Sequence, residues 1–203
     1  MHSPHCTVFL ALLCLVLSSC QPAVTPTGIV PEQPVVLLPL SGPLAEARSE
    51  LSGLAWLGDR LLLLPQYPER FDEAGGDGAL FTLTRAEILA CLPQGDCPPL
   101  LPQPLRLEAP GLTQLVPGFE GFEAIALDGE TAYLTIEASS GGGMMGYLVR
   151  GRYDAAQNSL RLELDTLHPL PPQAELDNMS DEALLLLPEG VLTFYEANGR
   201  SVN

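Results

Sequence analysis

A chain of 203 residues, 46% of them hydrophobic, is long and apolar enough for one domain with a sizeable core, which excludes a disordered tail. Its 25 acidic and 9 basic residues give a net charge of −16, and the basic residues are all arginine. A surface this acidic repels phosphate backbones, so we expect no nucleic-acid partner. The 20 proline and 19 glycine residues punctuate short elements and favour an all-β fold.

The N-terminal segment predicts an export signal. Residues 7–17 form an apolar run of 11 residues, which is too short to span a bilayer and is typical of the hydrophobic part of a signal peptide. Leu17-Ser18-Ser19-Cys20 ends this run and resembles the lipobox of bacterial lipoproteins, in which the chain is cleaved before the cysteine and acyl chains are attached to it. The residues before the run contain no Lys or Arg, which departs from that family.

This resemblance implies a signal peptide over residues 1–19, a lipid on Cys20 and an extracytoplasmic location at a membrane of the bacterial cell envelope. Residues 20–43 are rich in proline and poor in charge, so we expect an extended tether before a folded domain over residues 44–203. A buried hydrophobic helix is the alternative for the apolar run.

The cysteines fit an oxidising compartment. Outside the signal and the lipid site the chain has Cys91 and Cys97 alone, with Pro93 and Gly95 between them. An even pair in an exported protein predicts a disulfide that closes this small loop. A redox or metal pair is the alternative, but the spacing is not CxxC and no histidine lies nearby.

The domain contains a repeated pattern of two apolar runs around a tight polar turn, which is typical of a β-hairpin. The copies are Leu54–Gln66, Glu123–Ala138 and Glu182–Ala197. In the second and third copies two glutamates lie 14 positions apart (137 − 123 and 196 − 182). We align Leu54 and Gln66 with these glutamates, which makes the first copy two residues shorter. The runs are apolar on both faces, which predicts strands covered on both sides.

Each interval between copies has room for two more strands, and the candidates are residues 79–83, 104–107, 146–153 and 160–164. Four strands per unit predict a β-propeller-like fold of about two and a half four-stranded blades, with a β-sandwich as the alternative. Because a propeller typically closes with four to eight blades, we expect this chain to be a truncated form of a longer protein.

The segments Ser52–Trp56, Glu120–Ile125 and Asp181–Leu184 are similar to the blade openings of extracytoplasmic propellers of the esterase-like phytase family and the SMP-30/gluconolactonase group. In such families the innermost strands present carboxylates to a central channel, where they bind Ca²⁺ or another divalent cation. The resemblance therefore implies a metal or ligand site, with oxygen ligands of the kind that Ca²⁺ prefers, built from Glu123, Glu137, Asp181, Glu182, Glu196 and Asn198. Glutamates that cap strands or bond to backbone amides are the alternative.

The sequence is compatible with two functions. The first is a membrane-anchored, extracytoplasmic module that binds an unknown small molecule or envelope protein. The alternative is a Ca²⁺-dependent hydrolase of a phosphoester or a lactone. A serine nucleophile is disfavoured because the chain has no Gly-x-Ser-x-Gly elbow. The sequence does not decide whether the chain is an enzyme.

The lipid anchor has a direct test. Replacing the proposed acyl acceptor, Cys20→Ala, is expected to leave an unprocessed precursor that takes up no radiolabelled fatty acid. Cys14→Ala, inside the apolar run, is the matched control and is expected to be labelled and cleaved normally. Labelling that persists in the Cys20→Ala variant would rule out Cys20 as the anchor.

Overall fold

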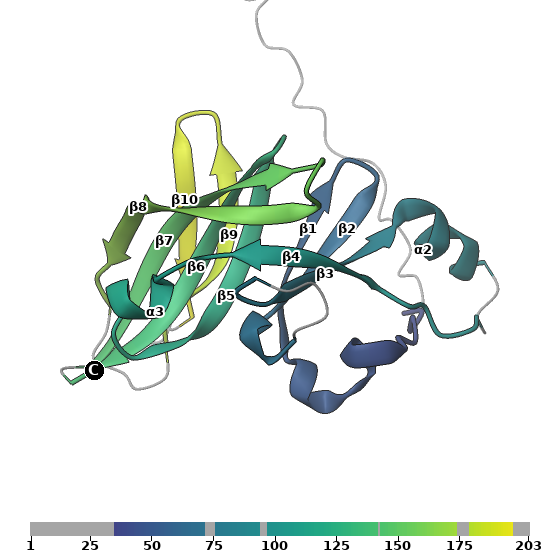
Figure 1. Cartoon of the computed structure of the whole chain (residues 1–203), viewed down its shortest axis with the longest axis horizontal. Helices are drawn as coiled ribbons and strands as arrows, with labels where there is room; N and C mark the ends of the chain where they lie inside the picture. Colours follow the sequence, from purple (N-terminus) through teal and green to yellow (C-terminus); the bar gives the residue numbers. More distant parts are fainter. Residues whose placement is uncertain (1–34, 72–75, 94–96, 142, 174–178, 197–203) are drawn as a thin grey trace, which may run out of the picture. The chain divides into compact units, whose positions relative to one another are not determined.

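The computed structural model describes residues 35–71, 76–93, 97–141, 143–173 and 179–196, and Val36–Asn203 form one compact unit. The expected all-β fold is confirmed, since this unit contains ten strands and only short helices (Figure 1). The signal, Cys20, most of the tether and Asn198 lie outside the described residues. Within those residues, no helix has the length and apolar character needed to cross a membrane.

Two antiparallel meanders of four strands each make up most of the unit. The first contains β1 (Leu51–Leu57), β2 (Arg60–Pro65), β3 (Ala79–Thr84) and β4 (Gln103–Glu108), and the second contains β5 (Phe119–Asp128), β6 (Thr131–Ser140), β7 (Gly143–Asp154) and β8 (Ser159–Leu170). A short parallel pairing of β4 with β8 joins them into one eight-stranded sheet. The four-strand units expected from the sequence are therefore present, but they share one sheet.

The eight-stranded sheet is barrel-like and nearly closed, because its two outermost strands, β1 and β5, lie side by side. The backbone N–H of Phe122 donates to the carbonyl oxygen of Gln66, just after β2, at 2.8 Å. The main core lies between the two meanders, where side chains of both bury each other, together with the short helix α3 (Leu112–Leu115). The largest fully buried members include Phe122, Leu62, Leu64, Leu134 and Ile136.

A second, smaller core covers the opposite face of the first meander. Phe71 and Phe81 meet edge to face there, with ring centroids 5.3 Å apart. Short 3-10 helices border it: η2 (Gly42–Ala45), η3 (Ala47–Ser49) and η4 (Pro68–Arg70). This core reaches Leu63 of β2 but leaves β1 uncovered.

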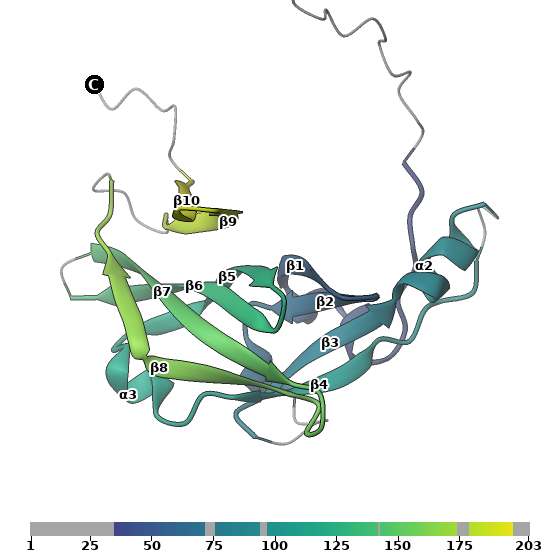
Figure 2. The ribbon, with the colours of Figure 1, turned by 90° about the horizontal axis from the view of Figure 1, so that it is seen from above.

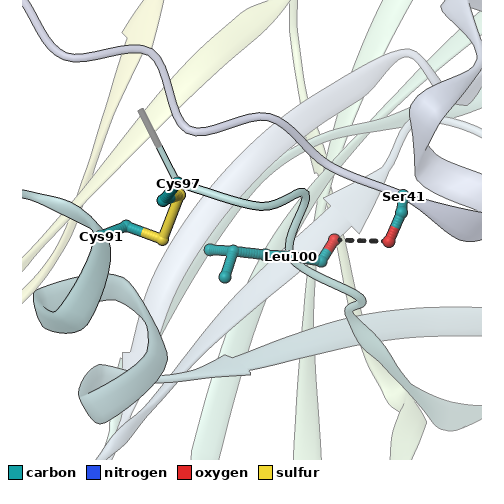
Figure 3. The surroundings of a disulfide bond; sticks show 4 residues. All are labelled: Ser41, Cys91, Cys97 and Leu100. Atoms are coloured by element: carbon teal, nitrogen blue, oxygen red, sulfur yellow. Dashed lines mark hydrogen bonds between the residues drawn. A yellow bond between two sulfur atoms is a disulfide. The ribbon is translucent and has the colours of Figure 1, made fainter. Parts of the chain in front are cut away.

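Helix α2 (Arg85–Cys91) was not predicted from the sequence. It begins at a capping box, in which the Thr84 hydroxyl accepts from the Glu87 amide and the Glu87 carboxylate accepts from the Thr84 amide. The helix ends at Cys91, which is joined to Cys97 by a disulfide, with the two Cα atoms 5.2 Å apart (Figure 3). These are the two cysteines that the sequence pairs.

The remaining strands, β9 (Asp181–Leu187) and β10 (Gly190–Tyr195), form a separate hairpin that lies over β5 and β6 (Figure 2). The three repeated segments are thus hairpin 1 (β1–β2), hairpin 2 (β5–β6) and hairpin 3 (β9–β10). Each has a two-residue turn, five consecutive residue pairs and then one bulged residue on its first strand. Hairpin 2 lies between the other two, beside hairpin 1 on one face and hairpin 3 on the other.

This shared register corrects the alignment of the first copy. The bulged residue is Ser52 in hairpin 1, and its counterparts are Glu123 and Glu182, so Leu54 is not the matching residue. With Ser52 in place, Gln66 follows at the same spacing of 14 (66 − 52), and hairpin 1 is not shorter than the others. The apolar run concealed the offset, since a bulge adds one residue to a strand without changing its composition.

The prediction that all repeated strands are covered on both sides is wrong. Among the described residues, β5 and β6 of hairpin 2 pack against neighbours on both faces. In contrast, β1, β9 and β10 each expose large apolar side chains. The physical reason is position, because among the described residues hairpins 1 and 3 each have a neighbouring hairpin on one face only.

The close approach of hairpins 1 and 2 predicts a strong effect at Gly121. A Cβ there would lie 2.5 Å from Gln66 Cγ, and its φ of +137° is strained for any other residue. Gly121→Ala is expected to lower the free energy of unfolding by roughly 2–5 kcal/mol, from backbone strain and overpacking together. Gly129→Ala is the matched control: φ is also positive, nothing lies within 4 Å, and about 1 kcal/mol is expected. Equal losses in urea denaturation of the two variants would contradict this packing.

Candidate functional site

The strand bulges present glutamates at one end of the hairpins. Glu123 and Glu182 are the bulged residues of hairpins 2 and 3, and Glu120 lies at a second irregularity of β5. A bulged residue is left out of the ladder, so its side chain is aimed differently from those of its neighbours. The bulge therefore gives two of the predicted site residues equivalent positions.

Glu123 lies at the contact between hairpins 1 and 2. It is buried, and its Oε1 accepts a hydrogen bond of 2.8 Å from Gln66 Nε2. Burial raises the pKa of the Glu123 carboxyl to about 7, although the hydrogen bond from Gln66 lowers it. Three nearby carboxylates add to the rise, namely Glu182, Glu137 and Glu196.

Glu137 occupies in hairpin 2 the position that Gln66 occupies in hairpin 1. Glycines flank it across the ladder on both sides, Gly121 on β5 and Gly146 on β7. The residue is 5% exposed, and its Oε1 has no hydrogen-bond partner among the described residues. Ser180 Oγ is buried beside this carboxyl without forming a hydrogen bond of normal geometry to it. Two buried oxygen atoms therefore have no hydrogen-bond partner of normal geometry among the described residues.

The pKa of the Glu137 carboxyl is also raised to about 7. Burial is the main cause, and the carboxylates of Glu182, Glu120 and Glu196 follow. The pKa of Glu182 is raised by its partial burial and by Glu196. A low dielectric and like charges both disfavour ionisation, so the cluster carries fewer negative charges than its composition suggests.

The structure brings together four of the predicted site residues, Glu123, Glu137, Glu182 and Glu196, within electrostatic reach of one another. Asp181 is buried next to them, with its Oδ2 3.0 Å from the point where a Cβ on Gly146 would lie. Sequence reasoning missed Gln66, Glu120 and Ser180. Gln66 was aligned with Glu137 from the sequence but not counted as a site residue, and the sequence offered no signal for Ser180.

No preformed metal centre is visible in the described ranges, where no three His, Cys, Asp or Glu side chains are placed to hold one ion. Two cavities, of about 690 and 570 Å³, lie elsewhere in the fold. Three of the arginines line the first, but three acidic side chains line it as well, so it carries no excess of positive charge: Arg106, Arg152, Arg161, Glu108, Glu130 and Asp154. The carboxylate cluster lines neither cavity.

Comparison of this chain with known proteins identified no relative. No protein-family model matches this chain, and neither a curated protein nor a solved structure is significantly similar to it.

The raised pKa values predict that the protein is more stable in mild acid than in mild alkali. A carboxyl whose pKa rises from 4.5 to about 7 on folding contributes stability that is complete below the unfolded pKa and is lost as the pH rises through the folded one, by up to about 3 kcal/mol. The thermal midpoint is therefore expected to fall between about pH 5 and about pH 8.

Glu137→Gln removes one of these carboxyls and is expected to reduce that fall, with a midpoint above that of the parent chain at the alkaline end. Glu189→Gln, at the exposed turn of hairpin 3, is the control and is expected to leave the pH profile unchanged. Differential scanning calorimetry across the pH range makes the comparison. A parent chain that gains stability over the same interval would show that these carboxyls are not held in their protonated form.

Proposed function

We propose that this protein is a lipid-anchored, extracytoplasmic binding module with a propeller-like repeat, which takes up a cationic group at the carboxylate cluster. The observation that carries the proposal is a pair of buried oxygens, Glu137 Oε1 and Ser180 Oγ, which have no hydrogen-bond partner among the described residues and lie beside the carboxylates placed by the repeated bulge. The lipid anchor rests on the lipobox at Cys20.

The propeller interpretation is supported by the stacking of the hairpins. Successive blades of a propeller place their innermost strands around a central axis. Here the first strands of the three hairpins follow one another in space, with β1 beside β5 and β5 beside β9 (Figures 1 and 2). The parallel pairing of β4 with β8 departs from that plan, because outer strands of separate blades do not pair. The described strands would correspond to two blades and the inner hairpin of a third.

A cationic ligand is supported by charge and by ligand type. The chain carries a net charge of −16, which attracts cations to its surface. A cation beside Glu137 and Glu182 would offset their mutual repulsion, and oxygen-only surroundings suit a hard divalent cation or an ammonium group. The contact between hairpins 1 and 2 needs no cation, because Gln66 donates a hydrogen bond to the Glu123 carboxylate there. Between hairpins 2 and 3 the equivalent position holds a second carboxylate.

One observation favours the alternative function, a Ca²⁺-dependent hydrolase of phosphoesters or lactones. A carboxyl with a pKa near 7, such as that of Glu123, is suited to general acid–base catalysis at neutral pH. Binding of a cationic group is the better-supported function, because it requires only the buried oxygens of Glu137 and Ser180.

The experiment compares two cationic probes, CaCl₂ and 1,5-diaminopentane, at constant ionic strength. Binding to the folded state raises the thermal midpoint by mass action, with about 2.7 kcal/mol expected at a hundredfold excess over Kd. Glu137→Gln and Glu182→Gln are expected to abolish the rise, and Glu189→Gln to retain it. Calcium acting alone identifies a metal site, and the diamine acting alone identifies an ammonium site.

The proposal fails if neither probe stabilises the chain beyond an equivalent addition of NaCl, or if the two cluster variants respond like the parent. Turnover of p-nitrophenyl phosphate or of a simple lactone that depends on Glu123 and on CaCl₂ would instead establish the hydrolase.

A further inference from the structure

Two exposed apolar faces lie at opposite ends of the stack of hairpins. On hairpin 1 the side chains of Leu54 and Trp56 are 60% and 46% exposed. On hairpin 3 four large apolar side chains are exposed along one face, and they come alternately from both strands: Leu185, Leu187, Leu192 and Phe194. Such contiguous exposure is unusual for a surface that stays in water.

The shared register shows which faces these are. In hairpin 1, Leu57, Leu62 and Leu64 form the face that packs into the core against hairpin 2, and we call this the front face. Counting from the bulge, the same positions of hairpin 3 are Leu187, Leu192 and Phe194. The exposed face of hairpin 3 is therefore a front face without a following hairpin among the described residues.

The exposed face of hairpin 1 is the complementary one. Hairpin 2 packs against the front face of hairpin 1 through Ile125, Leu127 and Leu134, which we call its back face. The same positions of hairpin 1 are Leu54, Trp56 and Leu63. Leu63 is buried in the second core, so the exposed part of this back face belongs to β1. One end of the stack thus offers a front face and the other end a back face, and the contact that joins these two types of surface already exists inside the chain.

We propose that copies of this chain associate head to tail, with the front face of hairpin 3 in one copy packed on the back face of hairpin 1 in the next. The occupant is a second copy because the contact continues the series that joins hairpin 1 to hairpin 2 and hairpin 2 to hairpin 3. The two faces cannot meet within one copy, since hairpin 2 separates them. A contact between two different patches on identical chains is heterologous, so it generates either a closed ring or a growing row.

The test is sedimentation velocity of the full chain in mild detergent. The parent chain is expected to sediment as a dimer or a larger species. Leu54→Glu places a charge on the back face of hairpin 1, and Leu192→Glu places one on the front face of hairpin 3. Each variant alone is expected to weaken association at least about tenfold. Leu115→Glu is the matched control, because Leu115 is a similarly exposed leucine at the end of α3, outside both faces, and it is expected to behave like the parent.

Mixing the two face variants separates a head-to-tail contact from any other. Each variant retains the face that the other has lost, so an equimolar mixture is expected to form one-to-one dimers and nothing larger. A mixture that remains monomeric while the parent associates would overturn the head-to-tail arrangement, and a monomeric parent would overturn the association itself. If either first variant unfolds, as judged by circular dichroism, the experiment is repeated with Trp56→Glu on the back face and Phe194→Glu on the front face.

Discussion

The packing of hairpin 2 against hairpin 1 is the contact on which the other features depend. Side chains of both hairpins meet in the main core, and a glycine on each side lets the backbones come close: Gly53 faces Ile125, and Gly121 faces Gln66. The backbone hydrogen bond from Phe122 to Gln66 fixes the two hairpins along their length. This contact brings β1 beside β5, and the eight-stranded sheet curls to near closure as a result.

The same geometry determines the electrostatics of the carboxylate cluster. Each hairpin has a bulge at the same distance from its turn, and Glu123, the bulged residue of hairpin 2, accepts a hydrogen bond from Gln66 of the preceding hairpin. Where an amide and a carboxylate meet, as at Gln66 and Glu123, a hydrogen bond satisfies both. Burial and the neighbouring glutamates raise the pKa of the Glu123 and Glu137 carboxyls alike, so both retain their protons more strongly. The repeat thus produces one contact in which an amide bonds to a carboxylate and one in which two buried oxygens have no partner among the described residues.

The repeat also explains why apolar side chains are exposed at the ends of the stack. A hairpin that packs on both faces needs apolar side chains at successive positions of each strand, and all three copies have such runs. Only hairpin 2 has a neighbouring hairpin on each side among the described residues. The outer faces of hairpins 1 and 3 therefore carry apolar side chains that no neighbouring hairpin covers among the described residues.

Local patterns in the sequence determined the strands, because alternation, tight turns and apolar runs depend only on neighbouring residues. The all-β class and the four-strand units could be predicted in this way. The pairing of Cys91 with Cys97 was predicted from the even number of cysteines expected in an exported chain, and the clustering of Glu123, Glu137, Glu182 and Glu196 from the resemblance to propeller families. The capping box formed by Thr84 and Glu87 is a local pattern too, and it could have predicted α2.

Tertiary structure decided the rest. A bulge changes the register of a hairpin by one residue and leaves no mark on composition, so the true counterpart of Glu123 in the first copy, Ser52, emerged only from the strand pairing. The parallel pairing of β4 with β8, the burial of Ser180 beside Glu137 and the exposure of Leu54 all depend on residues far apart in the chain. The sequence specifies which side chains are apolar, but the packing of the hairpins determines which of them are buried and which stay exposed.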